Sequence, residues 1–312
     1  MGVALCALSH APLYGISDPE PQTTEQIHRA FDDMRAFIVD YDPELTIVFG
    51  PDHYNGVFYD MMPPFCVGAR ASSVGDWGTE TRPLPVDRTA ARALLTSVLN
   101  HGIDIAQSEE MFVDHGISQP LELLFGKGYV NPIIPVFINA VGLPLVPMQR
   151  IRLLGEAVGR HAIETGKRIL VIGSGGLSHD PPVPRLDEAP PEVVQRLIDG
   201  RDTTPEVRAA REKRIVEFGK SFAVGEAEAQ DINPAFDALI LRTLAGGDLT
   251  AVDGWTNSWF EEEGGHAAHE IRTWVAAYSA LDQAGPYRVT ASHYWPVKEW
   301  GTGFAMTTAI SV

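Results

Sequence analysis

The chain has 312 residues, of which 45% are hydrophobic and 21% are charged, a composition that is typical of a folded globular protein. Its formal net charge of −17 argues against nucleic acid or an anionic membrane as a partner, because both require a basic surface. It contains no apolar run long enough to span a membrane and no secretory leader, so we expect a cytoplasmic protein.

Strand-like and helix-like segments alternate along the first half of the chain. Buried strands are expected at residues 3–8 and 45–49, an extended segment interrupted by Pro63 and Pro64 at 58–67, and further strands at 103–106 and 132–139. The periodicity of the apolar residues predicts helices at 23–40, 88–99 and 119–124. Thr23 and Gln26 are placed like a capping box at the start of the first helix.

The second half continues this alternation and adds a long helical stretch. A helix at 149–165 and a buried strand at 168–172 precede a proline-rich surface segment, helices at 192–198, 205–224, 234–245 and 267–281, and strands at 287–295 and 303–310. The alternation predicts an α/β fold in which helices flank a central mixed β-sheet. We expect a single domain, residues 1–312, with a helical insertion at about 181–265.

Four of the ten histidines share one kind of position in the chain. Each lies in a short turn that follows, or is set to follow, a buried segment: His10, His53, His115 and His179. Open α/β sheets form their sites at the carboxyl ends of strands, so we expect these side chains to lie close together. A histidine considered alone is more often a hydrogen-bonded structural residue, and it is the shared position that favours a joint site.

Two histidines and one carboxylate can form a facial triad, which leaves coordination positions open on a ferrous ion. Glu270 is placed to supply the carboxylate, since it lies near the apolar face of the expected helix at 267–281. An equally good interpretation is a carboxylate near a helix N-terminus, stabilised by the helix dipole. The run of three glutamates at 261–263 is expected to form a solvated surface.

Competing motifs are incomplete. His269 and Glu270 begin like the zinc-binding helix of a metalloprotease, but Thr273 occupies the position of the second histidine. The glycine-rich run at 173–176 follows a strand, yet no Lys-Ser/Thr pair follows it and it does not match the dinucleotide-binding pattern. We expect these glycines to let the backbone approach a ligand closely and to orient His179.

Seven segments carry a resemblance that runs nearly from end to end: residues 8–10, 50–56, 59–66, 113–116, 135–139, 173–179 and 269–277. In these segments the chain resembles the class III extradiol ring-cleavage dioxygenases, the superfamily that includes protocatechuate 4,5-dioxygenase. The resemblance implies a homo-oligomeric enzyme of aromatic catabolism, whose substrates are a catechol and O2.

The resemblance also implies roles for the five singled-out residues. Ferrous iron (Fe2+) would be held by His10, His53 and Glu270, with His115 as proton donor and His179 as proton acceptor. The expected substrates are 2,3-dihydroxyphenylpropionate and 2,3-dihydroxycinnamate, cleaved beside the diol to 2-hydroxy-6-oxononadienedioate-type products.

Several alternatives stay open at this point. The same fold could act on another catechol or on an aminophenol, it could be a zinc-dependent hydrolase, or it could be a metal-binding scaffold without activity. Tyr54, Asn55 and Arg272 are candidates for the substrate pocket. A substrate carboxylate could be bound by Arg272, Arg185, Arg150 or Arg152, which the sequence does not rank. The carboxylate that orients each histidine is also undetermined.

Overall fold

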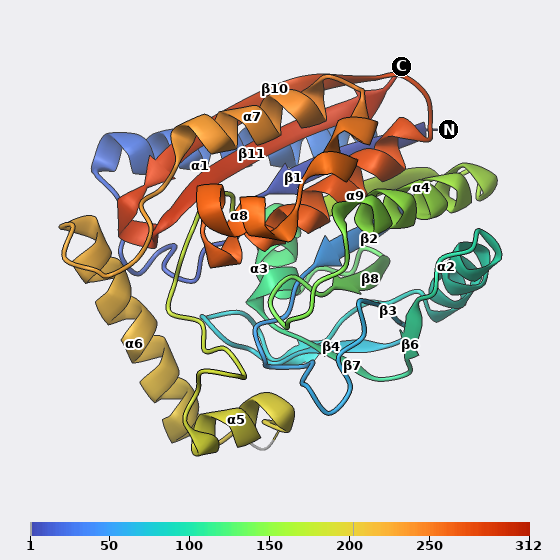
Figure 1. The fold of residues 1–312 in the computed structure, drawn as a ribbon. Helices are drawn as coiled ribbons and strands as arrows, with labels where there is room; N and C mark the ends of the chain where they lie inside the picture. The colour runs from blue at the N-terminus through green and yellow to red at the C-terminus, as the bar shows by residue number, and fades with distance from the viewer. Residues whose placement is uncertain (1, 202) are drawn as a thin grey trace.

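Figure 1 shows the fold in a computed structural model, which describes residues 2–201 and 203–312. A mixed sheet of eight strands forms the centre, in the order β10-β11-β1-β9-β2-β8-β3-β6. The strands are β1 (Gly2–Leu8), β2 (Leu45–Gly50), β3 (Phe65–Gly68), β6 (Ala106–Ser108), β8 (Ile133–Ile138), β9 (Arg168–Ser174), β10 (Tyr287–Val297) and β11 (Thr302–Ser311). The neighbours β1, β9, β2 and β8 are parallel, whereas β11 and β3 run antiparallel on either side of them.

Helices cover both faces of this sheet, and the residues of β1 divide between the two cores. Val3, Leu5 and Ala7 pack with α2 (Arg88–Asn100), α4 (Met148–Glu164) and α9 (Ile271–Asp282), and Ala4, Cys6 and Leu8 pack with α1 (Pro21–Tyr41) and α3 (His115–Phe125). A strand that is buried on both faces needs an apolar residue at every position, which explains its continuous apolar run. The predicted α/β fold with a central mixed sheet flanked by helices is confirmed.

Four further helices lie between β9 and α9 in the sequence: α5 (Pro191–Ile198), α6 (Pro205–Ala223), α7 (Pro234–Ala245) and α8 (Asn257–Gly264). Figure 1 shows α5 and α6 at the periphery, whereas α7 and α8 lie against the body of the molecule. Three 3-10 helices are η1 (Leu249–Gly254), η2 (His266–Glu270) and η3 (Lys298–Trp300), and a small second sheet has the order β5-β4-β7 (Arg82–Pro83, Ala71–Ser73, Met111–Val113). Within the two described ranges, no helix is both long and apolar enough to cross a membrane.

The starts of two helices differ from the prediction. Helix α1 begins at Pro21, and the hydroxyl of Thr23 donates a hydrogen bond to Glu20 Oε1, so the expected capping box is wrong. Proline is favoured in a first helical turn because it has no N–H to leave without a partner. Helix α3 begins at His115, four residues earlier than expected, because the side chain of Asp114 caps its first turn.

Three more expectations need correction. The extended segment expected at 58–67 is reduced to β3 (Phe65–Gly68), and the strand expected at 103–106 is β6 (Ala106–Ser108). The helix expected at 267–281 is divided into η2, which ends at Glu270, and α9.

Candidate active site

Three adjacent parallel strands bring three of the singled-out histidines to one edge of the sheet. His10 follows β1, His179 follows β9 and His53 follows β2, and these strands are neighbours in the order β1-β9-β2. His115 arrives from a different direction, as the first residue of α3. The expectation that the four turn histidines lie close together therefore holds for strands that are far apart in the sequence.

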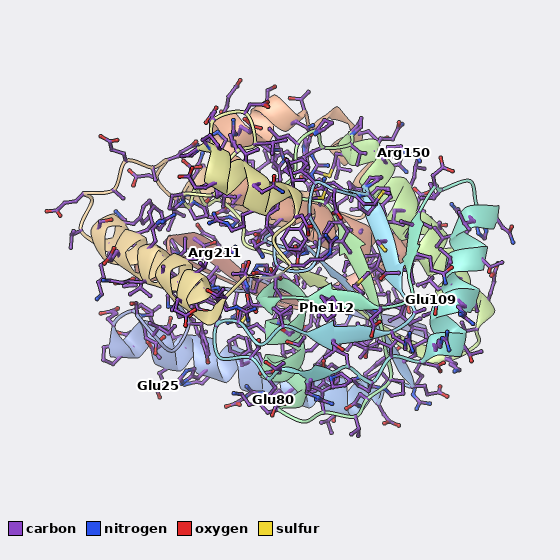
Figure 2. The ribbon with its side chains drawn as sticks, turned by 90° about the horizontal axis from the view of Figure 1, so that it is seen from below. Glu25, Glu80, Glu109, Phe112, Arg150 and Arg211 are labelled. Carbon is purple, nitrogen blue, oxygen red and sulfur yellow. The ribbon has the colours of Figure 1, made fainter. Side chains whose placement is uncertain are left out.

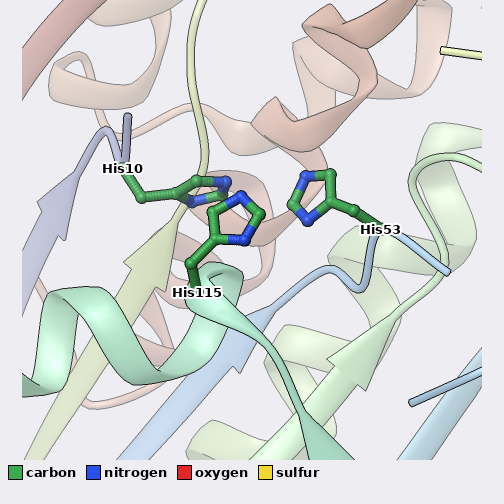
Figure 3. A group of neighbouring side chains, drawn as sticks. All are labelled: His10, His53 and His115. Atoms are coloured by element: carbon green, nitrogen blue, oxygen red, sulfur yellow. The ribbon is translucent and has the colours of Figure 1, made fainter. Parts of the chain in front are cut away.

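Figure 3 shows how closely three of these rings gather. One ligand atom from each of His10, His53 and His115 lies within 4.8 Å of the others. The rings of His53 and His115 are stacked at 4.4 Å, and the ring of His10 stands edge-on to both, at 5.4 and 5.3 Å. A second group within the same limit consists of Asp76, Asp114 and His115.

The carboxylate of Glu270 lies among three of the imidazoles. Its Oε1 atom is 2.9 Å from His53 Nε2 and 3.5 Å from His179 Nε2, and its Oε2 atom is 3.4 Å from His10 Nε2. The backbone N–H of Gly176 also donates to Oε2 at 2.8 Å. Although burial raises the pKa of Glu270, the surrounding imidazoles hold it well below its ordinary value.

Each of the four histidines also makes a contact through its Nδ1 atom. The partners are Ser174 Oγ for His10 (3.0 Å), Asp114 Oδ2 for His53 (3.0 Å), Asp76 Oδ2 for His115 (2.6 Å) and the carbonyl oxygen of Leu177 for His179 (2.8 Å). The hydroxyl of Ser174 donates to the carbonyl oxygen of Gly116 at 2.6 Å, so Ser174 must accept from His10. In a neutral ring the proton then lies on Nδ1, and Nε2 carries a lone pair.

This arrangement fits a bound cation. The Nε2 atoms of His10 and His53 both face the buried carboxylate of Glu270. Although burial lowers the pKa of His53, Asp114 and Glu270 raise it well above its ordinary value, and a cation at this point would replace the proton between His53 and Glu270. No lysine or arginine of the described chain forms an ion pair with Glu270. Burial lowers the pKa of His10 to about 3, which keeps that ring neutral and available as a ligand. A divalent ion between these atoms would satisfy all three.

A cavity of about 420 Å³ opens onto the cluster and is lined by the four histidines and Glu270. Its size is within the range of small-molecule sites. Tyr54 and Asn55 also line it, and Asn55 donates from Nδ2 to Asp114 Oδ2 at 2.9 Å. Asn55 therefore supports the carboxylate that contacts His53.

Arg272 lies outside the lining of this cavity, contrary to its selection as a pocket residue. Its side chain is completely buried, and its guanidinium donates to the carbonyl oxygen of Val146 at 2.7 Å and to Asn257 Oδ1 at 2.6 Å. Burial lowers its pKa to about 10. A side chain with these partners supports the fold rather than a ligand.

Sequence reasoning missed several residues of the cavity and its surroundings. Asp76 lies 39 residues before His115, and no local pattern marks it as a partner. Arg196 on α5 and Arg211 on α6 line the cavity, although their helices gave no sign of facing it. Glu261 was expected on a solvated surface; instead it also lines the cavity, accepts a hydrogen bond from Arg185 at 3.3 Å and is 28% exposed.

Comparison with known proteins identifies the family. The model of the family described as the catalytic LigB subunit of aromatic ring-opening dioxygenase matches residues 4–305. The chain belongs to this family. It is therefore an oxidoreductase that opens aromatic rings, and the family resemblance carried by the seven segments is confirmed.

Relatives of this ring-opening dioxygenase match it along its whole length. A protein from Rhodococcus sp. is 55% identical over 312 residues, which cover 100% of this chain and 99% of the relative. Proteins from Rhodococcus jostii and Cupriavidus pinatubonensis are 52% and 49% identical and cover 100% and 98% of this chain, and 99% and 97% of the relatives. All three are named 2,3-dihydroxyphenylpropionate/2,3-dihydroxicinnamic acid 1,2-dioxygenase.

Proposed function

We propose that the protein is an Fe(II)-dependent extradiol dioxygenase, which uses O2 to cleave 2,3-dihydroxyphenylpropionate and 2,3-dihydroxycinnamate beside the diol. The names of its full-length relatives support the substrate. The observation that carries the proposal is the approach of the Nε2 atoms of His10 and His53 to one buried carboxylate. The Nδ1 atom of each ring contacts a hydrogen-bond acceptor on another residue. We further propose that residues 1–312 act as one catalytic domain. Its assembly as a homo-oligomer and its cytoplasmic location stay predictions.

The metal ligands in this proposal are His10, His53 and Glu270. Two neutral imidazoles and one carboxylate on one side of an ion leave room for both oxygens of a catechol and for O2. Bound iron supplies the redox chemistry that lets O2 react with the ring and lowers the pKa of a coordinated hydroxyl. His115 could also reach an ion, but His10 and His53 both point Nε2 at Glu270, which supports the carboxylate as the third ligand.

His179 and His115 then handle protons on the two sides of the substrate. His179 donates from Nδ1 to the carbonyl oxygen of Leu177, so its neutral ring has Nε2 available to accept a proton from the diol. His115 holds Nδ1 against the carboxylate of Asp76 and, when protonated on both nitrogens, donates from Nε2. Both rings line the cavity, so each can reach a bound catechol.

The test is an aerobic assay with Fe(II)-loaded protein and 2,3-dihydroxyphenylpropionate, which follows the yellow ring-opened product. We expect His10→Ala, His53→Ala and Glu270→Ala to lose iron. We expect His115→Ala and His179→Ala to keep iron and substrate binding but to lose turnover by about 10²–10⁴-fold. His28→Ala, on the exposed side of α1, serves as the control and should keep both.

Two results would contradict the proposal. Loss of iron from His115→Ala together with its retention by Glu270→Ala would make His115 the third ligand. Ring cleavage by zinc-loaded, iron-free protein would contradict the role of Fe(II), because zinc does not perform the redox step.

A further inference from the structure

Four arginines of α5 and α6 line the cavity: Arg196, Arg208, Arg211 and Arg214. Arg211, on α6, donates from its guanidinium to the carbonyl oxygen of His53 at 3.1 Å and to Asn55 Oδ1 at 3.4 Å. Arg196, on α5, lines the same cavity. Figure 2 shows Arg211 on α6, well separated from Arg150 on α4. The part of the cavity wall formed by Arg211 therefore adjoins the turn that carries a proposed metal ligand.

The other arginines considered for a substrate carboxylate are engaged elsewhere or lie outside the cavity. Arg185 is paired with Glu261 at 3.3 Å, and Arg152 is paired with Asp253 at 2.7 Å. Arg272 is buried against neutral oxygens, and Arg150 does not line the cavity. In contrast, neither Arg196 nor Arg211 forms an ion pair with any carboxylate in residues 2–201 and 203–312; the recorded partners of Arg211 are neutral oxygens.

The two guanidiniums also repel each other. Burial and the nearby charge of Arg196 lower the pKa of Arg211 more than Asp114, Asp52 and Asp76 raise it, and burial and the charge of Arg214 lower the pKa of Arg196. Partly buried positive charges that form no ion pair are unfavourable, and an anion bound beside them would lower this cost. A carboxylate suits this position because its two oxygens match the fork of N–H groups on a guanidinium.

We propose that Arg196 and Arg211 bind the side-chain carboxylate of the substrate, while the diol lies at the histidine cluster. This inference rests on the proposed function and names the feature that selects among catechols. The preferred substrates are catechols with a short acidic side chain next to the diol. Arg211 contacts His53 directly, so the two ends of the substrate are bound on either side of a single turn.

The inference is tested by anaerobic titration calorimetry with iron-free protein, using 2,3-dihydroxyphenylpropionate and 3-propylcatechol as ligands. The two ligands differ in the carboxylate, and the measurement requires no turnover. We expect the wild type to bind the acid at least about 10-fold more tightly, as charge-assisted hydrogen bonds provide. Arg196→Gln and Arg211→Gln should each remove most of this preference. Lys220→Gln, which removes a positive charge from the same helix outside the cavity lining, should retain it.

Loss of the fold in one variant would not mimic this result. Within residues 2–201 and 203–312 the side chain of Arg196 forms no hydrogen bond, so Arg196→Gln leaves no buried partner behind and tests the inference even if Arg211→Gln does not fold. Equal affinity of the wild type for the two ligands, or a full preference for the acid in folded Arg196→Gln, would overturn the inference. Ring cleavage by the Fe(II)-loaded wild type tests the proposed function separately. Cleavage without tighter binding of the acid would contradict only the inference. Tighter binding of the acid without cleavage would contradict only the proposed function.

Discussion

Asp114 accepts hydrogen bonds from both the backbone and the ring of His53. One carboxylate oxygen, Oδ2, accepts from the backbone N–H of His53 at 2.8 Å and from the ring Nδ1 at 3.0 Å. The other oxygen accepts from the backbone N–H of Gly116 at 2.9 Å and caps α3. One buried side chain thereby ties the turn of one proposed metal ligand to the helix that begins with His115.

Asp114→Asn should weaken metal binding and the fold together. The amide keeps the size of the side chain but removes the charge, and its NH2 group cannot accept from His53. We expect Fe(II) affinity to fall about 10–100-fold, measured by competition with a chelator. The free energy of unfolding in urea should fall by about 1–3 kcal/mol. Asp104→Asn, at an exposed position, is the control, and unchanged iron affinity in Asp114→Asn would show that Asp114 does not orient a ligand.

The parts of the fold that were predicted correctly carry strong local patterns. The strands β1, β2, β8 and β9 are continuous apolar runs, and α4 and α7 show a clear helical period. The small second sheet was missed because its strands have only two or three residues, too few to show an alternation. The start of α3 at His115 was missed although the preceding Asp114 is of a residue type that favours helix N-caps.

The sequence predicts the site residues that follow strand ends, but it does not predict the partners that reach them through tertiary contacts. The carboxyl ends of parallel strands bring His10, His53 and His179 together by a general rule. The partners of the rings follow no such rule, because side chains adjacent in sequence point apart. Asp52 binds backbone N–H groups of its own turn, and Asp180 contacts His266 at 2.7 Å rather than the neighbouring His179.

Asp76→Asn should impair turnover while iron stays bound. Its Oδ2 atom is 2.6 Å from His115 Nδ1, and this contact fixes the tautomer and the direction of the ring. We expect kcat to fall about 10–100-fold and the pH profile of kcat to change, with iron content equal to that of the wild type. An equal loss of iron would instead place Asp76 among the groups that hold the metal. Asp104→Asn again supplies the matched control.

Because His161 is buried, we expect the free energy of unfolding to fall in mild acid. It lies on the buried face of α4, and burial lowers its pKa. The unfolded chain therefore binds a proton that the folded protein does not, so this contribution to stability is complete above about pH 6.5 and declines as the pH falls towards the folded pKa. The free energy of unfolding should drop less between pH 7.5 and 5.5 in His161→Gln than in the wild type. In the exposed control His28→Gln, the free energy of unfolding should drop as much as in the wild type. An identical drop in all three proteins would rule out this role for His161.

Gly175 makes room for Glu270. A Cβ atom at this position would lie 2.6 Å from both the Cβ and the carbonyl oxygen of Glu270, closer than such atoms approach in folded proteins. Gly175→Ala should therefore displace the carboxylate from His10 and His53, lower the free energy of unfolding by about 1–3 kcal/mol and reduce iron content. Gly254→Ala adds the same methyl group where nothing lies within 4 Å, and it should change neither quantity. Full iron content in folded Gly175→Ala would mean that the metal does not need Glu270 in its present position, and would count against this residue as a ligand.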